Sequence, residues 1–240
     1  MVAMEACCGV HHIGRIAAAL GPVVRPMSPE YVRPYVKAQK HDERDAAASV
    51  EAAPCPAMRF VALRSAARLD RPTLQRVQQR LVGVRRTLLN QLRAILFERG
   101  HAFPQGRRQL APAVDALLAN PEIPLSARML ALVMEIRAEW RELDRRIEAL
   151  NGEFVALARQ DATARRLATI PGVGVLAATG LIAAAGDGDA FRRGRDLGAW
   201  RGLVPRQHTT GGKPKRRGIG ERGTKELRVP LVHEARATPP

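Results

Sequence analysis

The chain has 240 residues, 46% hydrophobic but only 4% aromatic, and its 39 Lys and Arg exceed its 23 Asp and Glu by 16. No run of about 18 apolar residues and no signal-peptide pattern occurs, which excludes a membrane-spanning helix and predicts a soluble, cytoplasmic protein; three cysteines, two of them adjacent, exclude a disulfide framework. The net charge of +16 indicates a polyanionic partner, nucleic acid before an anionic membrane surface.

The first 27 residues have the pattern of a strand, a helix and a second strand. Apolar runs predict strands at Val2–Ala6 and Pro22–Met27, and the stretch Gly9–Leu20 between them predicts a helix. This is a βαβ fragment that begins within an element. We therefore expect the first strand and hairpin of its α/β sheet to be absent from the chain.

Three carboxylates are candidates for a metal site. A helix is predicted to begin near Asp42, and on a helix Asp42 and Asp45 share one face. Glu5 ends a predicted strand, and sites in α/β sheets gather where strands end. Convergent carboxylates suit Mg²⁺, which prefers oxygen ligands and is often shared with a phosphate. The alternative is that Asp42 caps the helix and Asp45 is solvated.

The central part of the chain predicts a strand and then a long helix. Met58–Leu63 has strand composition, and from Pro72 the apolar spacing changes to three, four or seven. A helix of about 25 residues is predicted there, ending before Gly100 and Pro104. Its apolar stripe consists of Leu74, Val77, Leu81, Val84, Leu88 and Ile95.

A second long helix is predicted to begin at Ser126, a suitable N-cap. The connector Phe103–Pro124, with one short helix, allows the two long helices to fold back as an antiparallel pair, or the stripe to take a helix from a second subunit. A helical spacer without chemistry is the simplest interpretation. The stripe of the second helix consists of Val133, Ile136, Trp140, Leu143, Ile147, Leu150, Phe154 and Leu157.

A glycine turn separates two predicted helices further along. Ile170–Val175 has the form apolar-Gly-x-Gly-apolar and precedes a predicted helix at Leu176–Ala185. This is the helix-hairpin-helix pattern, in which Gly172 and Gly174 would let backbone N–H groups approach a phosphate at a helix N-terminus. The alternative is a purely structural turn.

Two hydroxyl groups, Thr209 and Thr210, stand before Gly211 in the most basic segment of the chain. A hydroxyl beside cations is the arrangement expected where a nucleophile must approach a polyanionic backbone. The scarcity of aromatics favours duplex over single-stranded nucleic acid, and a solvated tail is the alternative. The candidate binding residues of this segment are Arg206, His208, Lys213, Lys215, Arg216 and Arg217.

These motifs resemble transposases of the insertion sequence 110 family (IS110/IS116/IS902 type), in particular its 1111-like branch. The resemblance covers essentially the whole chain, and its last motif is highly specific. The matching residues are 4–7 with His11 and His12, 31–37, Asp42 with Asp45, 58–61, 170–174 and 202–208.

The resemblance implies the fold class α/β plus α. It implies a partial RuvC-like (ribonuclease-H-type) domain at 1–68, antiparallel coiled-coil helices at 69–162, and a C-terminal transposase domain at 163–240 with the helix-hairpin-helix and a basic Thr-Gly-Gly loop. Four family acids hold Mg²⁺, and Glu5, Asp42 and Asp45 correspond to the last three. The first acid lies on the absent strand, which implies a chain shortened at the N-terminus. Family members usually continue with more helix, which implies that the chain is shortened at the C-terminus as well.

The family's nucleophilic serine corresponds to Thr210, with Thr209 as its neighbour. The implied mechanism is site-specific DNA recombination, in which this hydroxyl attacks a phosphodiester and forms a covalent protein–DNA intermediate with Mg²⁺ assistance. Threonine adds a methyl group and stiffens χ1. With one acid missing as well, the resemblance implies that this chain binds DNA with catalysis lost or impaired.

The implied partners are double-stranded DNA, an element-encoded guide RNA as a candidate second partner, and further copies of the chain in a homo-oligomer. Two other hypotheses fit the residues. A noncatalytic helix-hairpin-helix DNA-binding protein would show salt-dependent binding without a covalent adduct. A scaffold built on the coiled coil would be unaffected by replacing Arg206, Arg216 and Arg217 with alanine.

Overall fold

The computed structural model describes residues 1–36, 41–103, 105–120, 122–186, 188, 191–220, 228, 231–232 and 236, except for the side chain of Arg216. Lys37, the last residue of one motif, lies outside them. The chain divides into two compact units, Met1–Leu69 and Asp70–Pro240. Helices with two small sheets agree with the predicted α/β plus α class, while the RuvC-like, coiled-coil and helix-hairpin-helix assignments and the boundary at 163 stay predictions.

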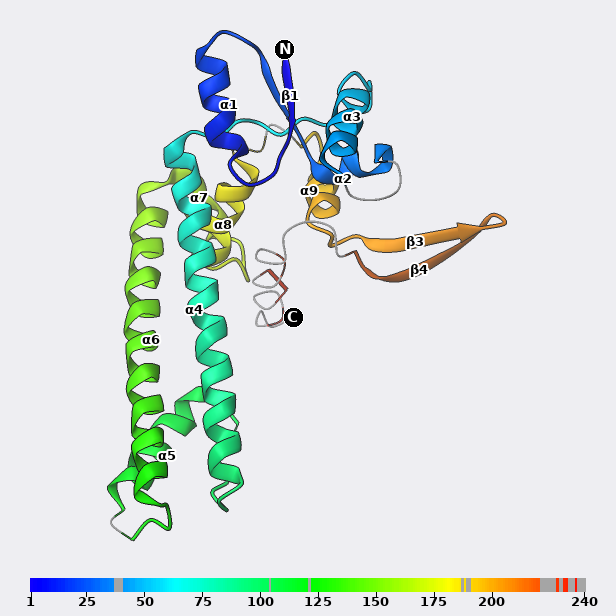
Figure 1. Ribbon diagram of the computed structural model, residues 1–240. Helices are drawn as coiled ribbons and strands as arrows, with labels where there is room; N and C mark the ends of the chain where they lie inside the picture. Colours follow the sequence, from blue (N-terminus) through cyan, green and yellow to red (C-terminus); the bar gives the residue numbers. More distant parts are fainter. Residues whose placement is uncertain are drawn as a thin grey trace. The chain divides into compact units, whose positions relative to one another are not determined.

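The first unit contains a βαβ arrangement (Figure 1). Its two strands are parallel, with Val2 opposite Val24 and Glu5 opposite Met27, and a helix forms the crossover that a parallel pair requires. The predicted βαβ fragment is confirmed. The elements of this unit are β1 (Val2–Glu5), α1 (Val10–Ala19), β2 (Val24–Met27), α2 (Pro29–Val32), the 3₁₀ helix η1 (Arg33–Tyr35) and α3 (Asp42–Ala52).

A small core holds α3 against β2 and α2. Met27 and Val32 are buried, and α3 contributes Ala48 and Ala52, which are also buried. Alanine side chains allow a helix to lie close to its neighbours, since nothing projects beyond Cβ. The close packing places the first turn of α3 in the same unit as the end of β1.

The prediction of a strand at Met58–Leu63 is wrong. Only Phe60 forms an antiparallel bridge, to Met27, and the N–H of Val61 donates to the carbonyl of Pro26 at 2.7 Å. Proline has no N–H, so β2 cannot return the bonds that a longer ladder at this edge would need. The segment is therefore extended but unpaired beyond the bridge.

Contacts with α1 hold the end of this segment. A Cβ built on Gly14 would lie 2.5 Å from Leu63 Cδ2, so the leucine packs where a larger helix residue would clash. His11 Nδ1 accepts the backbone N–H of Arg64 at 3.3 Å. Burial, and then the charges of Arg64 and Arg15, lower the pKa of His11, which keeps the imidazole neutral and able to accept this bond.

The second unit begins with two long antiparallel helices. Arg71 Nη1 reaches Asp161 Oδ2 at 2.8 Å and Arg85 Nη1 reaches Asp144 Oδ1 at 2.6 Å, so α4 and α6 run in opposite directions (Figure 1). The elements are α4 (Ala66–Phe97), α5 (Arg107–Ala119), α6 (Ala127–Gln160), α7 (Ala162–Leu167), α8 (Val175–Ala185), α9 (Gly194–Trp200), β3 (Pro205–Thr210) and β4 (Lys213–Ile219).

An apolar core, mostly of leucine side chains, forms where α5 packs on this helix pair. Leu92 and Leu96 of α4, Leu110 of α5 and Trp140 of α6 have no exposed surface and belong to one cluster. Burying a leucine contributes about 1.5–3 kcal/mol, so the cluster explains why three helices with weak individual stability stay together.

Helix α6 confirms the sequence prediction. Ser126 caps its first turn, with Oγ accepting the N–H of Met129 at 3.3 Å. Five predicted stripe residues are buried and the other three are half-buried. The buried ones are Val133, Trp140, Leu143, Ile147 and Phe154.

Helix α4 departs from its prediction in two ways. It begins at Ala66, before Pro72, which therefore lies inside the helix. Val84, assigned to the apolar stripe, is exposed, whereas Gln78 is buried and donates to Asn151 Oδ1 at 3.2 Å. The buried face is the one that α5 and α6 cover, and a polar residue can lie there because it has a partner.

Candidate functional site

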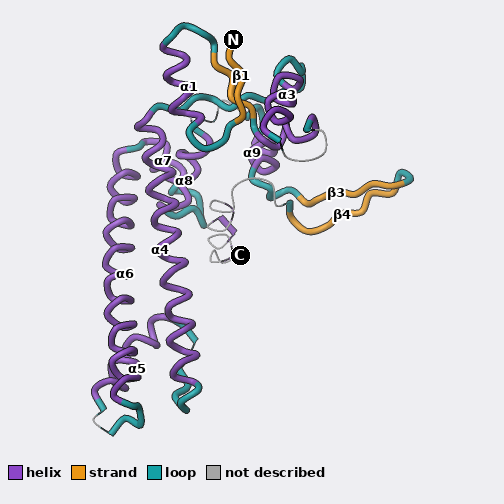
Figure 2. Tube along the Cα trace, viewed as in Figure 1, coloured by secondary structure: helices purple, strands orange, loops and turns teal. Residues whose placement is uncertain are grey.

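The segment predicted as a Thr-Gly-Gly loop is a β-hairpin. Strands β3 and β4 pair antiparallel and are joined by Gly211 and Gly212 (Figure 2). The φ angles of these glycines are +58° and +74°, the left-handed values that both central residues of a type I′ turn require. Two glycines in succession therefore fix the tightest turn and place the threonines at the end of a strand.

The register of this hairpin determines which side chains share a face. Thr210 pairs with Lys213 and His208 pairs with Lys215. Directly opposed residues project to the same face, as do residues two apart in one strand. Arg206 joins them by alternation along β3. We call this set, Arg206, His208, Thr210, Lys213 and Lys215, the cationic face.

Thr209 lies on the opposite face. It pairs with Pro214, and its Oγ1 accepts a hydrogen bond from Gln207 Nε2 at 3.0 Å. Gln207 precedes it by two residues and so projects to the same side. The two neighbouring hydroxyls that the sequence could not distinguish are thus separated by the hairpin: Thr210 lies on the face of Lys213 and Lys215, and Thr209 lies on the face of Gln207 and Pro214.

The hairpin carries charge of one sign and is open to solvent. No acidic residue occurs from Pro205 to Ile219, and every residue of β3 is exposed. Arg217 is also exposed, at the irregular part of the register, and the side chain of Arg216 lies outside the described part of the chain. An exposed ribbon of like charges attracts polyanions over about a Debye length, 8 Å at physiological salt.

A compact turn leads the chain from α9 into the hairpin. The ring centroids of Trp200 and Phe191 lie 4.9 Å apart, and Cζ of the Arg201 guanidinium lies 3.6 Å from the Trp200 ring centroid. Gly202 then takes φ +67°, which reverses the chain direction before β3. The tilted ring pair and the cation–π contact fix the base from which the hairpin starts.

The glycine turn at 170–174 has a helix after it, as predicted. Gly172 has φ +77° and Gly174 is the N-cap of α8, without a side-chain cap bond. The helix before the turn, α7, is short; Asp161 caps it by accepting the N–H groups of Thr163 and Ala164 at 3.0 and 3.1 Å. Phosphate contact at Gly172 and Gly174 stays a prediction.

The three predicted metal ligands lie on elements of the first unit that pack together. Glu5 ends β1, while Asp42 and Asp45 occupy the first turn of α3. Asp42 does not cap this helix, because His41 occupies the N-cap position. Within the described residues, no three His, Cys, Asp or Glu side chains form a group that could hold a metal ion.

Sequence reasoning missed an arginine cluster in the second unit. Arg85, Arg86 and Arg93 of α4 and Arg107 of α5 line one pocket. The seven-residue spacing of Arg86 and Arg93, which places them on one helix face, was a signal in the sequence. The contribution of Arg107 depends on how α5 folds back and had no such signal.

Among the helices of the described residues, none is long and apolar enough to span a bilayer.

Comparison with known proteins relates the chain to transposases. Residues 164–238 match the model of the Transposase IS116/IS110/IS902 family. A "Probable family 20 transposase" of Pseudomonas aeruginosa is 42% identical over 238 residues, covering 99% of this chain and 70% of that protein. The "Transposase for insertion sequence element IS1111A" of Coxiella burnetii is 37% identical over 236 residues, covering 98% and 65%.

A third relative extends the agreement. The "Transposase for insertion sequence element IS1328" of Yersinia enterocolitica is 39% identical over 237 residues, which cover 98% of this chain and 70% of the relative. The matches include both compact units and the hairpin, since they span nearly every residue. The chain belongs to the IS116/IS110/IS902 family of transposases.

Proposed function

We propose that this chain binds double-stranded DNA and acts in DNA transposition of an insertion sequence, with Thr210 as the hydroxyl that attacks a phosphodiester. The observation that carries the proposal is the hairpin register, which gives Thr210 one face with Arg206, His208, Lys213 and Lys215. Membership of a transposase family supports the substrate class.

The cationic face supplies the binding. Lys and Arg that neutralise phosphates release condensed counterions, which makes binding favourable and dependent on salt. Lys213 lies opposite Thr210, so a phosphate drawn to its ammonium is brought to the strand that bears the hydroxyl. A two-stranded ribbon also fits the major groove of B-form DNA, which is about 12 Å wide.

The proposed reaction is a transesterification. A bond forms between Thr210 Oγ1 and phosphorus, and the bond from phosphorus to one deoxyribose oxygen breaks. That oxygen takes up a proton, from the base that received the threonine proton or from solvent, and leaves as a hydroxyl. The threonine proton passes to a base, for which His208 on the same face is the candidate in the hairpin. The lysines stabilise the extra negative charge of the transition state.

The prediction of Mg²⁺ at Glu5, Asp42 and Asp45 stays a prediction. Within the described residues these carboxylates do not form a three-ligand group, although α3 and β1 belong to the same unit. Titration of the chain with Mg²⁺, followed by thermal unfolding of wild type and the variant Asp42→Asn, would show whether the ion binds there. A guide RNA and homo-oligomer formation are likewise proposals that the family resemblance supports.

The test is covalent capture of DNA. The chain is incubated with a radiolabelled duplex that carries a nick, so that the released strand diffuses away, and an adduct that survives denaturing electrophoresis is sought. Wild type and Thr209→Ala are expected to form it, at the reduced rate that the impaired catalysis predicted from the sequence implies, and Thr210→Ala is not. Salt-dependent binding with no adduct from any variant would instead favour the noncatalytic DNA-binding alternative.

A further inference from the structure

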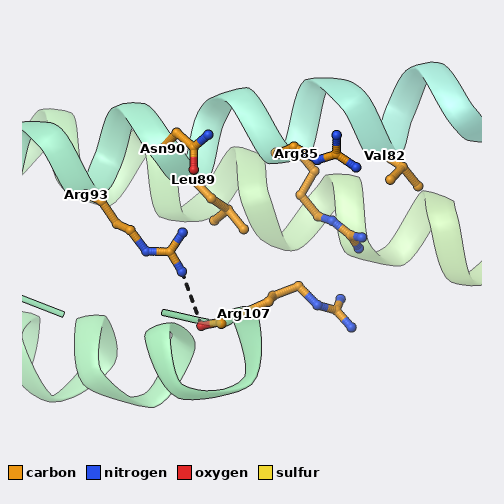
Figure 3. A pocket seen from close by; sticks show the side chains of 8 residues that line it. Val82, Arg85, Leu89, Asn90, Arg93 and Arg107 are labelled. Carbon is orange, nitrogen blue, oxygen red and sulfur yellow. Dashed lines mark hydrogen bonds between the residues drawn. The ribbon is translucent and has the colours of Figure 1, made fainter. Parts of the chain in front are cut away.

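Four arginines meet in a pocket between α4 and α5, away from the hairpin in the sequence. The pocket has a volume of about 250 Å³, and Arg85, Arg86, Arg93 and Arg107 line it together with Asn90. Figure 3 shows Arg85, Arg93 and Arg107 on either side of the space between the two helices. Nothing in the proposed reaction uses these residues.

One carboxylate serves two of the arginines. Asp144 Oδ1 accepts from Arg85 Nη1 at 2.6 Å and from Arg107 Nη1 at 2.8 Å. Within the described part of the chain, Arg86 and Arg93 have no ion pair. Four guanidinium groups thus share a single negative charge, and repulsion between like charges favours an added anion.

The arrangement of Arg93 is also incomplete. Its Nη2 donates to the carbonyl of Gly106 at 3.2 Å, whereas its buried Nε has no hydrogen-bond partner among the described residues (Figure 3). A buried charged donor left unpaired is unfavourable, so an acceptor at this point would stabilise it. Gly106 is also the N-cap of α5, with no side-chain cap, so the positive end of that helix dipole lies at the same pocket.

The rim of the pocket is accessible. Arg86, Asn90 and Arg107 are exposed, while Leu89 forms a buried floor. Arginine forks match the oxygens of a phosphate and bind them through paired hydrogen bonds. The net charge of +16 favours a polyanion, such as a nucleic-acid backbone, over a single free phosphate. We propose that this pocket, the arginine pocket, binds a phosphodiester group of a nucleic-acid backbone at a point separate from the hairpin.

The double variant Arg86→Gln/Arg93→Gln tests the proposal. Its control, Arg76→Gln/Arg80→Gln, removes two exposed charges from the same helix outside the pocket. Affinity for a 20-base-pair DNA duplex and for an RNA hairpin is measured from about 50 to 200 mM salt. For the pocket variant, the slope of log affinity against log salt is expected to become less steep by about one, either with DNA or with RNA. The nucleic acid that shows this change is the source of the phosphate. Equal changes in both variants, or none, would overturn the proposal.

Inorganic phosphate provides a second readout. It should raise the melting temperature of wild type and of the control relative to chloride at equal ionic strength, by mass action, but not that of the pocket variant. Because Arg93 is partly buried, Arg86→Gln alone, at the exposed rim, is measured as well and is expected to reduce the phosphate effect. An unchanged phosphate effect in Arg86→Gln and the double variant would contradict the site. Covalent capture by Thr210 is a separate measurement and does not depend on this result.

Discussion

Thr210 lies directly opposite Lys213 across the β3–β4 hairpin, whereas its neighbour Thr209 lies opposite Pro214 on the other face. The pairing gives the two hydroxyls different surroundings although they are adjacent in the chain. We expect Thr210→Ser to increase the rate of adduct formation by about tenfold, equivalent to about 1.4 kcal/mol, because serine lacks the methyl group that crowds the attacking oxygen. A Thr209→Ser variant should react as wild type does, and an equal gain from both would show that the face does not matter.

The Gly211–Gly212 turn should determine how stable the hairpin is. Gly212 has φ +74°, which costs a residue with a Cβ about 1–2 kcal/mol. Gly212→Ala is therefore expected to loosen the hairpin, seen as faster amide hydrogen exchange in β3 and β4 with the rest of the chain unchanged. Gly218→Ala is the matched control, because Gly218 has ordinary φ and open space around its Cβ position. Unaltered exchange in Gly212→Ala would contradict the turn assignment.

The lysines of the cationic face should determine how salt affects DNA binding. In the variant Lys213→Gln/Lys215→Gln, the slope of log affinity against log salt is expected to become less steep by about two on duplex DNA. The slope is measured by fluorescence anisotropy, with Arg76→Gln/Arg80→Gln as a control of equal charge. If the control lowers the slope as much, binding reflects total charge and the hairpin has no special part.

The pair Asp115 and Arg137 connects α5 to α6 and should make stability depend on pH. Arg137 Nε and Nη2 donate to the carboxylate at 2.8 and 2.7 Å, and these bonds lower the pKa of Asp115. The folded chain then binds fewer protons than the unfolded chain at acid pH. The contribution of this pair to the free energy of unfolding is fully present above the unfolded pKa of about 3.9. It is lost as the pH falls from that value through the lower pKa of Asp115 in the folded chain.

Replacing Asp115 tests this account. Asp115→Ala leaves Arg137, whose side chain is only 10% exposed, without its acceptor, so unfolding free energy at pH 7 should fall by about 1–3 kcal/mol. The decline of the unfolding free energy between about pH 4 and 2 should also be shallower in this variant than in wild type. Glu142→Ala, which removes the exposed pair with Arg145, should cause no measurable change in urea unfolding. Equal effects of the two variants would show that burial of Arg137 is unimportant.

The parts of the fold that local pattern determines were predictable. Ser126 and the stripe through Trp140 specify α6, because a cap and a 3.6-residue period act within one helix. The strand predicted at Met58–Leu63 does not form, because pairing depends on the partner strand and Pro26 of β2 has no N–H group to donate. The burial of Gln78 also depends on a partner, Asn151 of α6, more than 70 residues away.

The candidate site also has features that the local sequence predicts and features that depend on pairing with a distant segment. Glycines at 211 and 212 indicate a turn from sequence alone, and the cations around them indicate a polyanion. Which threonine faces those cations depends on hairpin register, which a composition pattern does not contain. The arginine pocket depends on how α5 packs against α4. The spacing of Arg86 and Arg93 was therefore the only part of it that the sequence indicated.

The most direct test of the central claim is to identify the residue that carries DNA. The adduct formed with the nicked duplex is digested with a nuclease and a protease, and the peptide that retains a nucleotide phosphate is sequenced by mass spectrometry. Our account predicts phosphate on Thr210, within the tryptic peptide from Gln207 to Lys215. Phosphate on Thr209 or at any other residue, or DNA bound without an adduct, would contradict it.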